Sequence, residues 1–187
     1  MKILISGYYG FGNAGDSLVL DSILGQIRAR DGKADITVLS ASPAYTAPVH
    51  NVKSVYRWNW IKIFTELRKC DVLISGGGGL FQDYTGNIGL YYYLGIIYLA
   101  KLLKKKVFIC AVGINELKKI NSAITSKVLR LADKITVREQ DSQELLVKWG
   151  CPREKIEVTA DPVLCNEYRQ RFLSKESPRI AIILRPR

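Results

Sequence analysis

Four consecutive glycines, one residue after a short apolar run, constrain the fold of this chain more than any other feature. The apolar run, Val72–Ile74, indicates a strand that is buried on both faces, as strands of parallel sheets are. The glycines that follow it are Gly76, Gly77, Gly78 and Gly79. Glycine adopts positive φ freely and lets another group approach the backbone closely. Gln82 and Asp83 come next, so the run predicts either a ligand-binding loop at the carboxyl end of this strand or a tight strand-to-helix turn.

Apolar runs and helical spacings alternate along the rest of the chain. The other runs that indicate strands are Lys2–Ser6, Asp35–Ser40, Val107–Val112, Ile135–Arg138, Glu157–Thr159 and Ile180–Leu184. The segments with helical patterns are Ser17–Arg30, Asn59–Lys69, Asn87–Lys105, Ile120–Ala132 and Asp141–Trp149. This alternation predicts an α/β fold, a doubly wound, mostly parallel Rossmann-like domain.

Local signals give expectations for helix starts and for one loop. Asp16 or Ser17 is suited to cap the first helix, and Asp141 and Glu144 have the spacing of a capping box. The segment 41–58 contains two prolines and is expected to be a loop.

The length of 187 residues predicts one domain and a fragment of another. We expect a domain over residues 1–165, a polar linker over 166–178, and the first strand of a second domain over 179–187. The rest of that second domain would lie outside this chain.

The formal net charge of +11 favours an anionic partner. Its basic residues are scattered and form no nucleic-acid-binding signature, so a small anionic ligand and solvated helix faces account for the charge.

The four cysteines form no C-x-x-C pair, and there is a single histidine, which predicts free thiols in a reducing cytosol and no metal site. Because the chain starts directly with a strand, we expect no signal peptide. The apolar stretch 88–103 is shorter than the roughly 20 residues that span a bilayer, which favours a buried helix.

A second glycine-rich loop follows the first strand and matches G-x-G-x-x-G over residues 10–15. Its candidate binding residues are Gly10, Gly12, Asn13 and Gly15. A dinucleotide site is disfavoured, because three residues separate the first strand from Gly10 and the second strand does not end in an acid. The loop can still offer backbone amides and a helix N-terminus to an anion.

With both loops considered, the sequence resembles the polysaccharide pyruvyl transferases. The matching stretches are G-Y-Y-G-F-G-N-A-G-D at 7–16, S-G-G-G-G-L-F-Q-D-Y-T at 75–85, V-R-E-Q-D-S at 137–142 and A-D-P at 160–162. Two departures stand out. Glu139 occupies a position where the family has Asp, and residues 111–116 replace the family's G-Q-G-I-G-P loop.

The resemblance implies transfer of a pyruvyl group from phosphoenolpyruvate to two hydroxyls of a hexose, giving a cyclic ketal on a cell-wall or exopolysaccharide precursor. It also implies a glycosyltransferase-B-type fold of two Rossmann-like halves, of which this chain is the N-terminal one. The expected partners are phosphoenolpyruvate, a sugar or lipid-linked saccharide acceptor and the second half of the protein, with no nucleic acid, cofactor or metal. The expected location is the cytoplasm, free or peripheral to the inner face of the membrane.

The same resemblance suggests roles for individual residues. Arg138 is the expected partner of the donor, because a guanidinium binds carboxylate and phosphate in a bidentate manner; a surface ion pair is the alternative. Asp16, Asp83 and Asp161 are the candidate general acid and base, and each also suits a cap or turn. The substrate-binding set comprises Gln82, Arg185 and the glycines and asparagine of the two loops.

The roles of a few residues and two alternative functions stay open at the level of the sequence. Trp58 and Trp60 suit either stacking on a sugar or a place in the core, and His50 is poorly placed for catalysis. A sugar-nucleotide-dependent glycosyltransferase would share the fold and the glycine loops. A non-catalytic relative with a binding or regulatory role is the third functional class to which the chain could belong.

Overall fold

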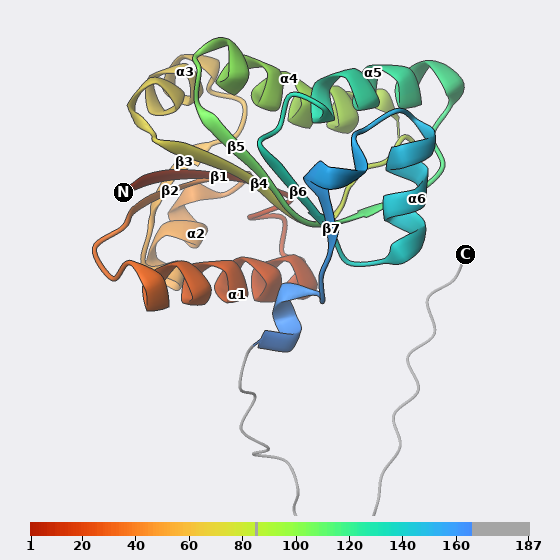
Figure 1. Ribbon diagram of the computed structural model, residues 1–187. Helices are drawn as coiled ribbons and strands as arrows, with labels where there is room; N and C mark the ends of the chain where they lie inside the picture. Colours follow the sequence, from red (N-terminus) through yellow and green to blue (C-terminus); the bar gives the residue numbers. More distant parts are fainter. Residues whose placement is uncertain (85, 166–187) are drawn as a thin grey trace, which may run out of the picture.

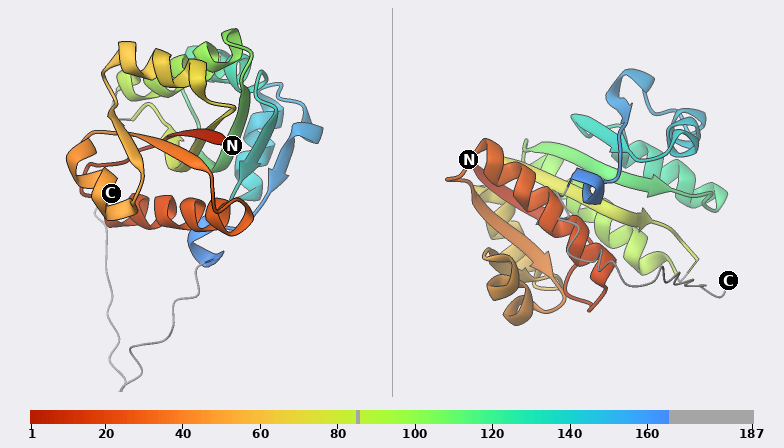
Figure 2. Two further views of the ribbon diagram at one scale, coloured as in Figure 1. Left: turned by 90° about the vertical axis from the view of Figure 1, so that its left-hand side faces the viewer. Right: turned by 90° about the horizontal axis from the view of Figure 1, so that it is seen from below.

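The computed structural model describes residues 1–84 and 86–165, and it contains one parallel sheet of seven strands between two layers of helices (Figures 1 and 2). The strands are β1 Lys2–Ser6, β2 Asp35–Ser40, β3 Lys53–Tyr56, β4 Val72–Phe81, β5 Lys106–Ile114, β6 Lys134–Val137 and β7 Ile156–Val158. The α-helices are α1 Ala14–Arg30, α2 Pro43–His50, α3 Trp60–Lys69, α4 Asn87–Leu102, α5 Lys119–Leu129 and α6 Gln140–Lys148. Two short 3-10 helices follow, η1 Arg153–Lys155 and η2 Pro162–Cys165.

The strand order β3-β2-β1-β4-β5-β6-β7 confirms the predicted doubly wound, Rossmann-like fold. The chain runs outward from β1 to β3, returns to β4 on the other side of β1, and then continues outward to β7. The winding direction therefore reverses between β1 and β4, which is where such sheets form a ligand-binding crevice. One glycine-rich stretch is the loop after β1, and the other forms the second half of β4 itself.

The core is split by the sheet into two clusters, and the alternation of side chains along β1 explains the division. Leu4 belongs to the cluster beneath α3 and α4, whereas Ile3 and Ile5 belong to the cluster beneath α1. All three are at most 2% exposed, because helices cover both faces of the sheet. This double coverage is why the strands are apolar at successive positions.

The segment expected to be a loop instead contains α2 and β3, so that prediction was wrong. Pro43 occupies the first turn of α2, where its fixed φ suits a helix and its missing N–H costs nothing. The helix ends at Asn51, which has a φ of 51°. β3 then pairs with β2 as an edge strand, in which only part of the surface is buried.

Two predicted helix caps were also wrong. Asn13 caps α1, accepting hydrogen bonds from the amides of Gly15 (2.9 Å) and Asp16 (3.4 Å), so Asp16 lies inside the first turn. At the start of α6 no side chain forms a cap bond, because the helix already begins at Gln140 and Asp141 falls within its first turn.

The glycine run continues β4 rather than ending it. β4 pairs with β5 from Val72 to Phe81, with an irregularity between Gly78 and Phe81. Gly77 and Gly78 have φ values of 87° and 74°, which strongly disfavour side chains. A Cβ on Gly76 would lie 2.7 Å from the Cβ of Cys110, so the glycines also allow the two strands to approach closely.

The other elements begin and end within about one helical turn of the predicted bounds. Among the described residues, no helix has the length and apolarity needed to cross a membrane. The expected linker 166–178, the expected strand 179–187 and Arg185 lie outside the residues that the structure describes.

Candidate functional site

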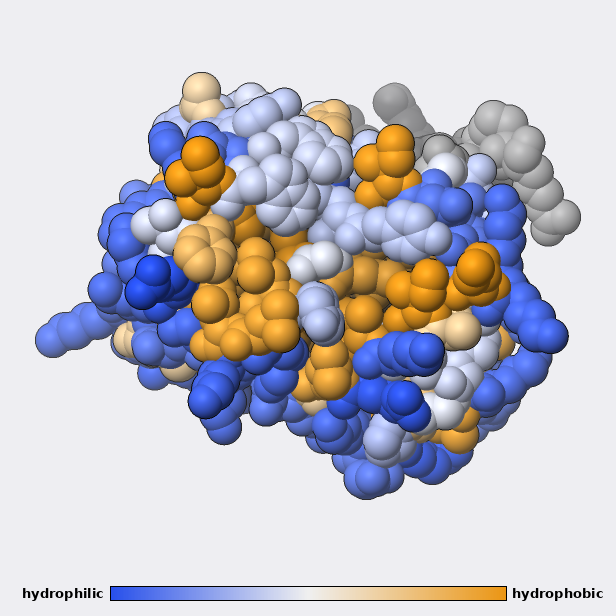
Figure 3. Space-filling view, turned by 90° about the horizontal axis from the view of Figure 1, so that it is seen from above, coloured by the Kyte–Doolittle hydropathy of each residue, from blue (hydrophilic) through white to orange (hydrophobic). Residues whose placement is uncertain are grey.

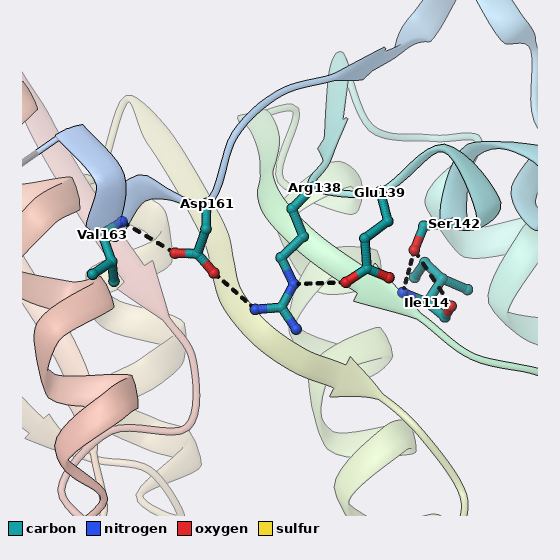
Figure 4. A network of polar contacts seen from close by, with 6 residues as sticks. All are labelled: Ile114, Arg138, Glu139, Ser142, Asp161 and Val163. Atoms are coloured by element: carbon teal, nitrogen blue, oxygen red, sulfur yellow. Dashed lines mark hydrogen bonds and ion pairs between the residues drawn. The ribbon is translucent and has the colours of Figure 1, made fainter. Parts of the chain in front are cut away.

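A half-buried ion pair between Arg138 and Asp161 lies at the carboxyl end of the sheet (Figure 4). Arg138 directly follows β6 and Asp161 follows β7, so parallel pairing of these strands brings the two side chains to one edge. The Nη1 of Arg138 donates to the Oδ2 of Asp161 at 2.8 Å. The second carboxylate oxygen of Asp161 accepts from the amide of Val163 at 3.1 Å, which fixes its orientation.

The rest of the Arg138 guanidinium is only loosely engaged. Glu139 makes an ion-pair contact of 3.5 Å with Nε, but Nε has no hydrogen-bond partner among the described residues. Gly113, at the end of β5, leaves room for the guanidinium, since a Cβ there would lie 3.1 Å from Nη2. Gly113 was not identified from the sequence as a site residue. The arginine is thus oriented by one carboxylate and retains N–H groups that can bind an anion.

Asp16 approaches the same edge from the first turn of α1. Its side chain contacts the glycine run, because a Cβ on Gly78 would lie 3.0 Å from Oδ1. Burial raises the pKa of Asp16, and the positive charge of Arg138 opposes the shift. The fold therefore gathers Asp16, Arg138 and Asp161, three of the four residues for which a catalytic role was predicted.

Asp83, the fourth, is engaged in a different place. Its Oδ2 accepts from the amide of Lys118 (3.0 Å) and from the Nδ2 of Asn121 (2.7 Å). α5 has no side-chain cap of its own, and Asp83, just after β4, binds the amide of its N-cap residue Lys118 and the side chain of Asn121 in its first turn. These hydrogen bonds lower the pKa of Asp83, and the one from Asn121 has the larger effect. This environment is that of a structural carboxylate.

The predicted glycines divide into those that face protein and those that face open space. Gly10 has a φ of 79°, and a Cβ there would clash with Ser40 and Ser42. Gly76 and Gly77 likewise abut Cys110 and Val19. Gly12 and Gly79 are exposed, and a Cβ added to either would have no other atom within 4 Å. Gly15 and Asn13 form the cap of α1, and Gln82 is half-buried.

A second feature of this edge was not predicted from the sequence. Arg57, after β3, is buried against the aromatic rings of Phe11, Trp58, Tyr92 and Tyr93. Nearby, the hydroxyl of Tyr9 donates to the carbonyl of Gly76 at 2.6 Å and joins the two glycine loops. The adjacent aromatic residues at 92–93 were the available signal, but nothing in their spacing indicates a cation as their partner.

The histidine and the cysteines do not add to the site. His50 lies in α2, and its Nδ1 is 2.6 Å from Oδ1 of Asp21. Burial raises the pKa of Cys70 and of Cys110 to about 11, which keeps both thiols protonated at neutral pH. Across residues 1–84 and 86–165, no group of three His, Cys, Asp or Glu side chains could hold a metal ion.

Comparisons with known proteins support one family. A family model described as "Polysaccharide pyruvyl transferase" matches residues 13–186. No curated protein matches the chain in a sequence search. Several solved structures share the fold. HepE from Anabaena, solved with UDP-glucose, has a TM-score of 0.62 at 12% identity, over 86% of this chain and 44% of HepE.

Two other solved structures give the same result. UDP-GlcNAc 2-epimerase from Neisseria meningitidis has a TM-score of 0.55 at 15% identity, over 87% of this chain and 47% of the epimerase. The lipopolysaccharide outer core galactosyltransferase WaaB has a TM-score of 0.55 at 14% identity, over 86% of this chain and 45% of its own. These neighbours are glycosyltransferases of the B type and epimerases, and at such identities they establish the fold alone. The chain spans less than half the length of each.

Proposed function

The chain belongs to the polysaccharide pyruvyl transferase family, and we propose that it forms the N-terminal half of an enzyme that transfers the pyruvyl group of phosphoenolpyruvate to a hexose. The observation that carries this proposal is the Arg138–Asp161 pair at the carboxyl edge of the sheet. An oriented guanidinium with free N–H groups matches a donor that presents a carboxylate and a phosphate together.

In the proposed reaction, the donor methylene carbon gains a proton while two sugar hydroxyls lose theirs. The first sugar oxygen bonds to the donor carbon that carries the phosphate, phosphate leaves with its bonding electrons and one proton, and the second oxygen closes the ketal. Arg138 holds the donor through its carboxylate or phosphate. The hydrogen bond to Asp161 orients the guanidinium of Arg138. A donor bound to this guanidinium is therefore held in a fixed orientation toward the acceptor.

Asp16 and Asp161 fit the two proton-transfer roles differently. The pKa of Asp16 is raised by burial, which favours its neutral form and suits a proton donor to the methylene carbon. Asp161, the other carboxylate at this edge, is then the candidate acceptor of a hydroxyl proton. Gly12 and Gly79, both exposed, leave backbone amides open to a ligand at the same edge.

The acceptor and the location belong to the same proposal. We propose a bacterial cell-wall or exopolysaccharide precursor, sugar or lipid-linked, as the acceptor, and a second Rossmann-like half that closes the active site. The enzyme would act in the cytoplasm, at the inner surface of the membrane, without a cofactor, a metal or nucleic acid.

A large apolar face supports the membrane location. Figure 3 looks onto the face covered by α3, α4 and α5, where apolar side chains gather in the middle and hydrophilic ones surround them. Ile61, Ile88 and Ile120 on these helices are 82%, 74% and 68% exposed. Glu66 is the only acidic residue in the segments 60–69, 87–106 and 118–130. The basic residues in these segments are Lys62, Arg68, Lys69, Lys101, Lys104, Lys105, Lys106, Lys118, Lys119, Lys127 and Arg130. Exposed apolar residues beside many basic ones suit an anionic lipid surface.

A sugar-nucleotide glycosyltransferase is the second candidate, because HepE and WaaB share the fold. The two functions release different products. With an acceptor saccharide, the complete protein is expected to release inorganic phosphate from phosphoenolpyruvate and to leave UDP-sugars intact. Release of UDP from a UDP-sugar, without phosphate release from phosphoenolpyruvate, would favour the glycosyltransferase instead.

A further inference from the structure

Arg57 is a buried cation enclosed by aromatic rings. Its Cζ lies 4.2 Å from the ring centroid of Tyr92, 5.0 Å from Phe11, 5.3 Å from Trp58 and 5.5 Å from Tyr93. The side chain is 5% exposed, and the two tyrosines are 3% and 4% exposed. Such rings stabilise the face of a guanidinium, and the hydroxyls of the two tyrosines interact with Arg57 as well, but none of these groups carries the negative charge that would neutralise it.

The polar groups of this cluster are left unsatisfied. Among the described residues, no carboxylate forms an ion pair with Arg57. Within the same described residues, the Nε of Arg57 and the hydroxyls of Tyr92 and Tyr93 are buried without a hydrogen bond of good geometry, although both hydroxyls lie close enough to Arg57 to interact with it. A buried charge without a counterion is costly, and buried polar groups without partners are rare in native proteins. One N–H group of the cation and the two hydroxyls beside it are in this position, which indicates that an anion completes the cluster.

The tyrosine hydroxyls have the protonation state that an anion requires. Burial raises the pKa of Tyr93 to about 12, although the Arg57 cation opposes the rise. Burial raises the pKa of Tyr92 as well. Both hydroxyls therefore keep their protons at neutral pH and can donate to an oxyanion.

The cluster lies at the same edge of the sheet as the Arg138 site. The amide of Arg57 donates to the carbonyl of Ser40 at the end of β2 (2.9 Å), which places it at the carboxyl edge of the sheet. Asp16 interacts electrostatically with both Tyr93 and Arg138. A ligand bound at Arg57 and a donor bound at Arg138 would thus lie at the same edge of the sheet, and each would be near groups that interact with Asp16.

We propose that the Arg57 cluster is a binding site for an anionic sugar. A phosphate or carboxylate of the sugar pairs with Arg57 and the two tyrosine hydroxyls. Apolar faces of the sugar ring pack on Phe11, Trp58 and Trp60, which are 44%, 43% and 43% exposed. The identification of this sugar as the acceptor rests on the proposed function, whereas its binding does not.

Tryptophan emission tests the binding directly, because Trp58 and Trp60 are two of the three tryptophans of the chain. The probes are glucose 1-phosphate, glucuronate and glucose. Saturable changes in emission are expected with either or both anionic sugars and not with glucose, and the comparison of the two identifies the oxyanion. An equal response to glucose, or no saturable response to any probe, would overturn the proposal.

Arg57→Met removes the charge and keeps an apolar chain of similar length. Affinity for the anionic sugar is expected to fall roughly tenfold to a hundredfold. Arg153→Met is the matched control, because Arg153 is an exposed arginine in η1, on the far side of the sheet order from β3, and its variant should bind normally. Unchanged affinity in Arg57→Met would contradict the site.

A second variant covers the case in which Arg57→Met fails to fold. Tyr93→Phe deletes one unpartnered hydroxyl, so it should keep or raise the melting temperature and weaken binding by severalfold. Unaltered affinity in this variant would also count against the site.

Because these measurements contain no phosphoenolpyruvate, they distinguish failure of this site from failure of the proposed transfer. A separate titration with phosphoenolpyruvate tests the acceptor assignment. If Arg57→Met abolishes binding of phosphoenolpyruvate, the cluster is a donor site and that assignment is wrong.

Discussion

Arg138 is the residue whose geometry matters most to the proposed chemistry. One carboxylate holds its Nη1 at 2.8 Å, and Nε remains without a hydrogen bond among the described residues. A lysine in this position would supply charge but not the planar fork that binds two oxygens together. Substitution by lysine therefore tests whether the guanidinium group of Arg138, and not only its positive charge, is needed.

In the complete protein, Arg138→Lys is expected to lower kcat/KM for phosphoenolpyruvate by roughly tenfold to a hundredfold, the worth of a charge-assisted hydrogen bond of about 1.5–3 kcal/mol. The melting temperature should change little, because the lysine retains a cation beside Asp161. Steady-state kinetics and thermal unfolding of one variant measure both quantities. Wild-type kinetics would show that the donor binds elsewhere.

The two carboxylates beside Arg138 provide a matched comparison. Asp161 is 28% exposed and forms a hydrogen bond, whereas Glu139 is 58% exposed and contacts Nε at 3.5 Å. We expect Asp161→Asn to lower kcat/KM at least tenfold and Glu139→Gln to have little effect, since exposed ion pairs contribute little. Equal effects in a kinetic comparison would mean that Asp161 does not orient the arginine.

Asp83 offers a prediction about pH. Its folded-state pKa is lowered by Asn121 and Lys118, so the stabilisation is present above the usual carboxyl pKa of about 3.9 and is lost as pH falls through the lower folded value. Asp83→Asn should lower the melting temperature at pH 7 by a few degrees, about the effect of losing one helix cap. The difference from wild type should shrink as the pH is lowered below about 4.

Thermal melts of both proteins from neutral to acid pH measure this convergence. The catalytic role that the sequence suggested for Asp83 makes a different prediction, a loss of about a hundredfold or more in kcat with an unchanged melting temperature. The two outcomes distinguish a structural carboxylate from a general acid or base.

At the scale of elements, β4 joins the core to the site. Its central glycines pack against β5 and α1, while Gly79, near its end, has open space around it. The same element thus combines a packing requirement with a surface that a ligand can approach.

Gly76→Ala should destabilise the fold by about 1–3 kcal/mol, because the added methyl would lie 2.7 Å from the Cβ of Cys110. Gly79→Ala is the control, since nothing lies within 4 Å of its added methyl. Denaturant unfolding of the two variants gives the comparison. Equal stability would mean that β4 and β5 can separate more easily than their pairing indicates.

At the scale of the whole molecule, the apolar face over α3, α4 and α5 predicts binding to vesicles. The protein should sediment with vesicles of phosphatidylglycerol, less with phosphatidylcholine, and less at high salt. Ile61→Asp should reduce this binding several-fold, whereas Val49→Asp, at a residue 54% exposed on α2, should not. Equal binding by both variants, or no preference for the anionic lipid, would exclude this face as the docking surface.

Much of the fold follows from local patterns. The strand Lys2–Ser6 and the strand Asp35–Ser40 have the predicted bounds, because a strand buried on both faces is apolar at nearly every position. The helix predicted over Asn59–Lys69 runs from Trp60 to Lys69, and Asn59 is its cap. The prediction of a loop over 41–58 was wrong because it took proline as a helix breaker. At the first turn of a helix, where Pro43 lies, proline favours the helix instead.

The residue types of the site were present in the motifs, but their grouping was decided in three dimensions. Arg138 and Asp161 are 23 residues apart and meet only because β6 and β7 pair in parallel. Asp83 looked equivalent to Asp161 in the sequence, yet packing of α5 against the end of β4 gave it a structural role. Arg57 carried no local signal at all. Its burial among rings from the first loop, the segment after β3 and α4 depends on contacts between distant segments, and such contacts exist only once the sheet has formed.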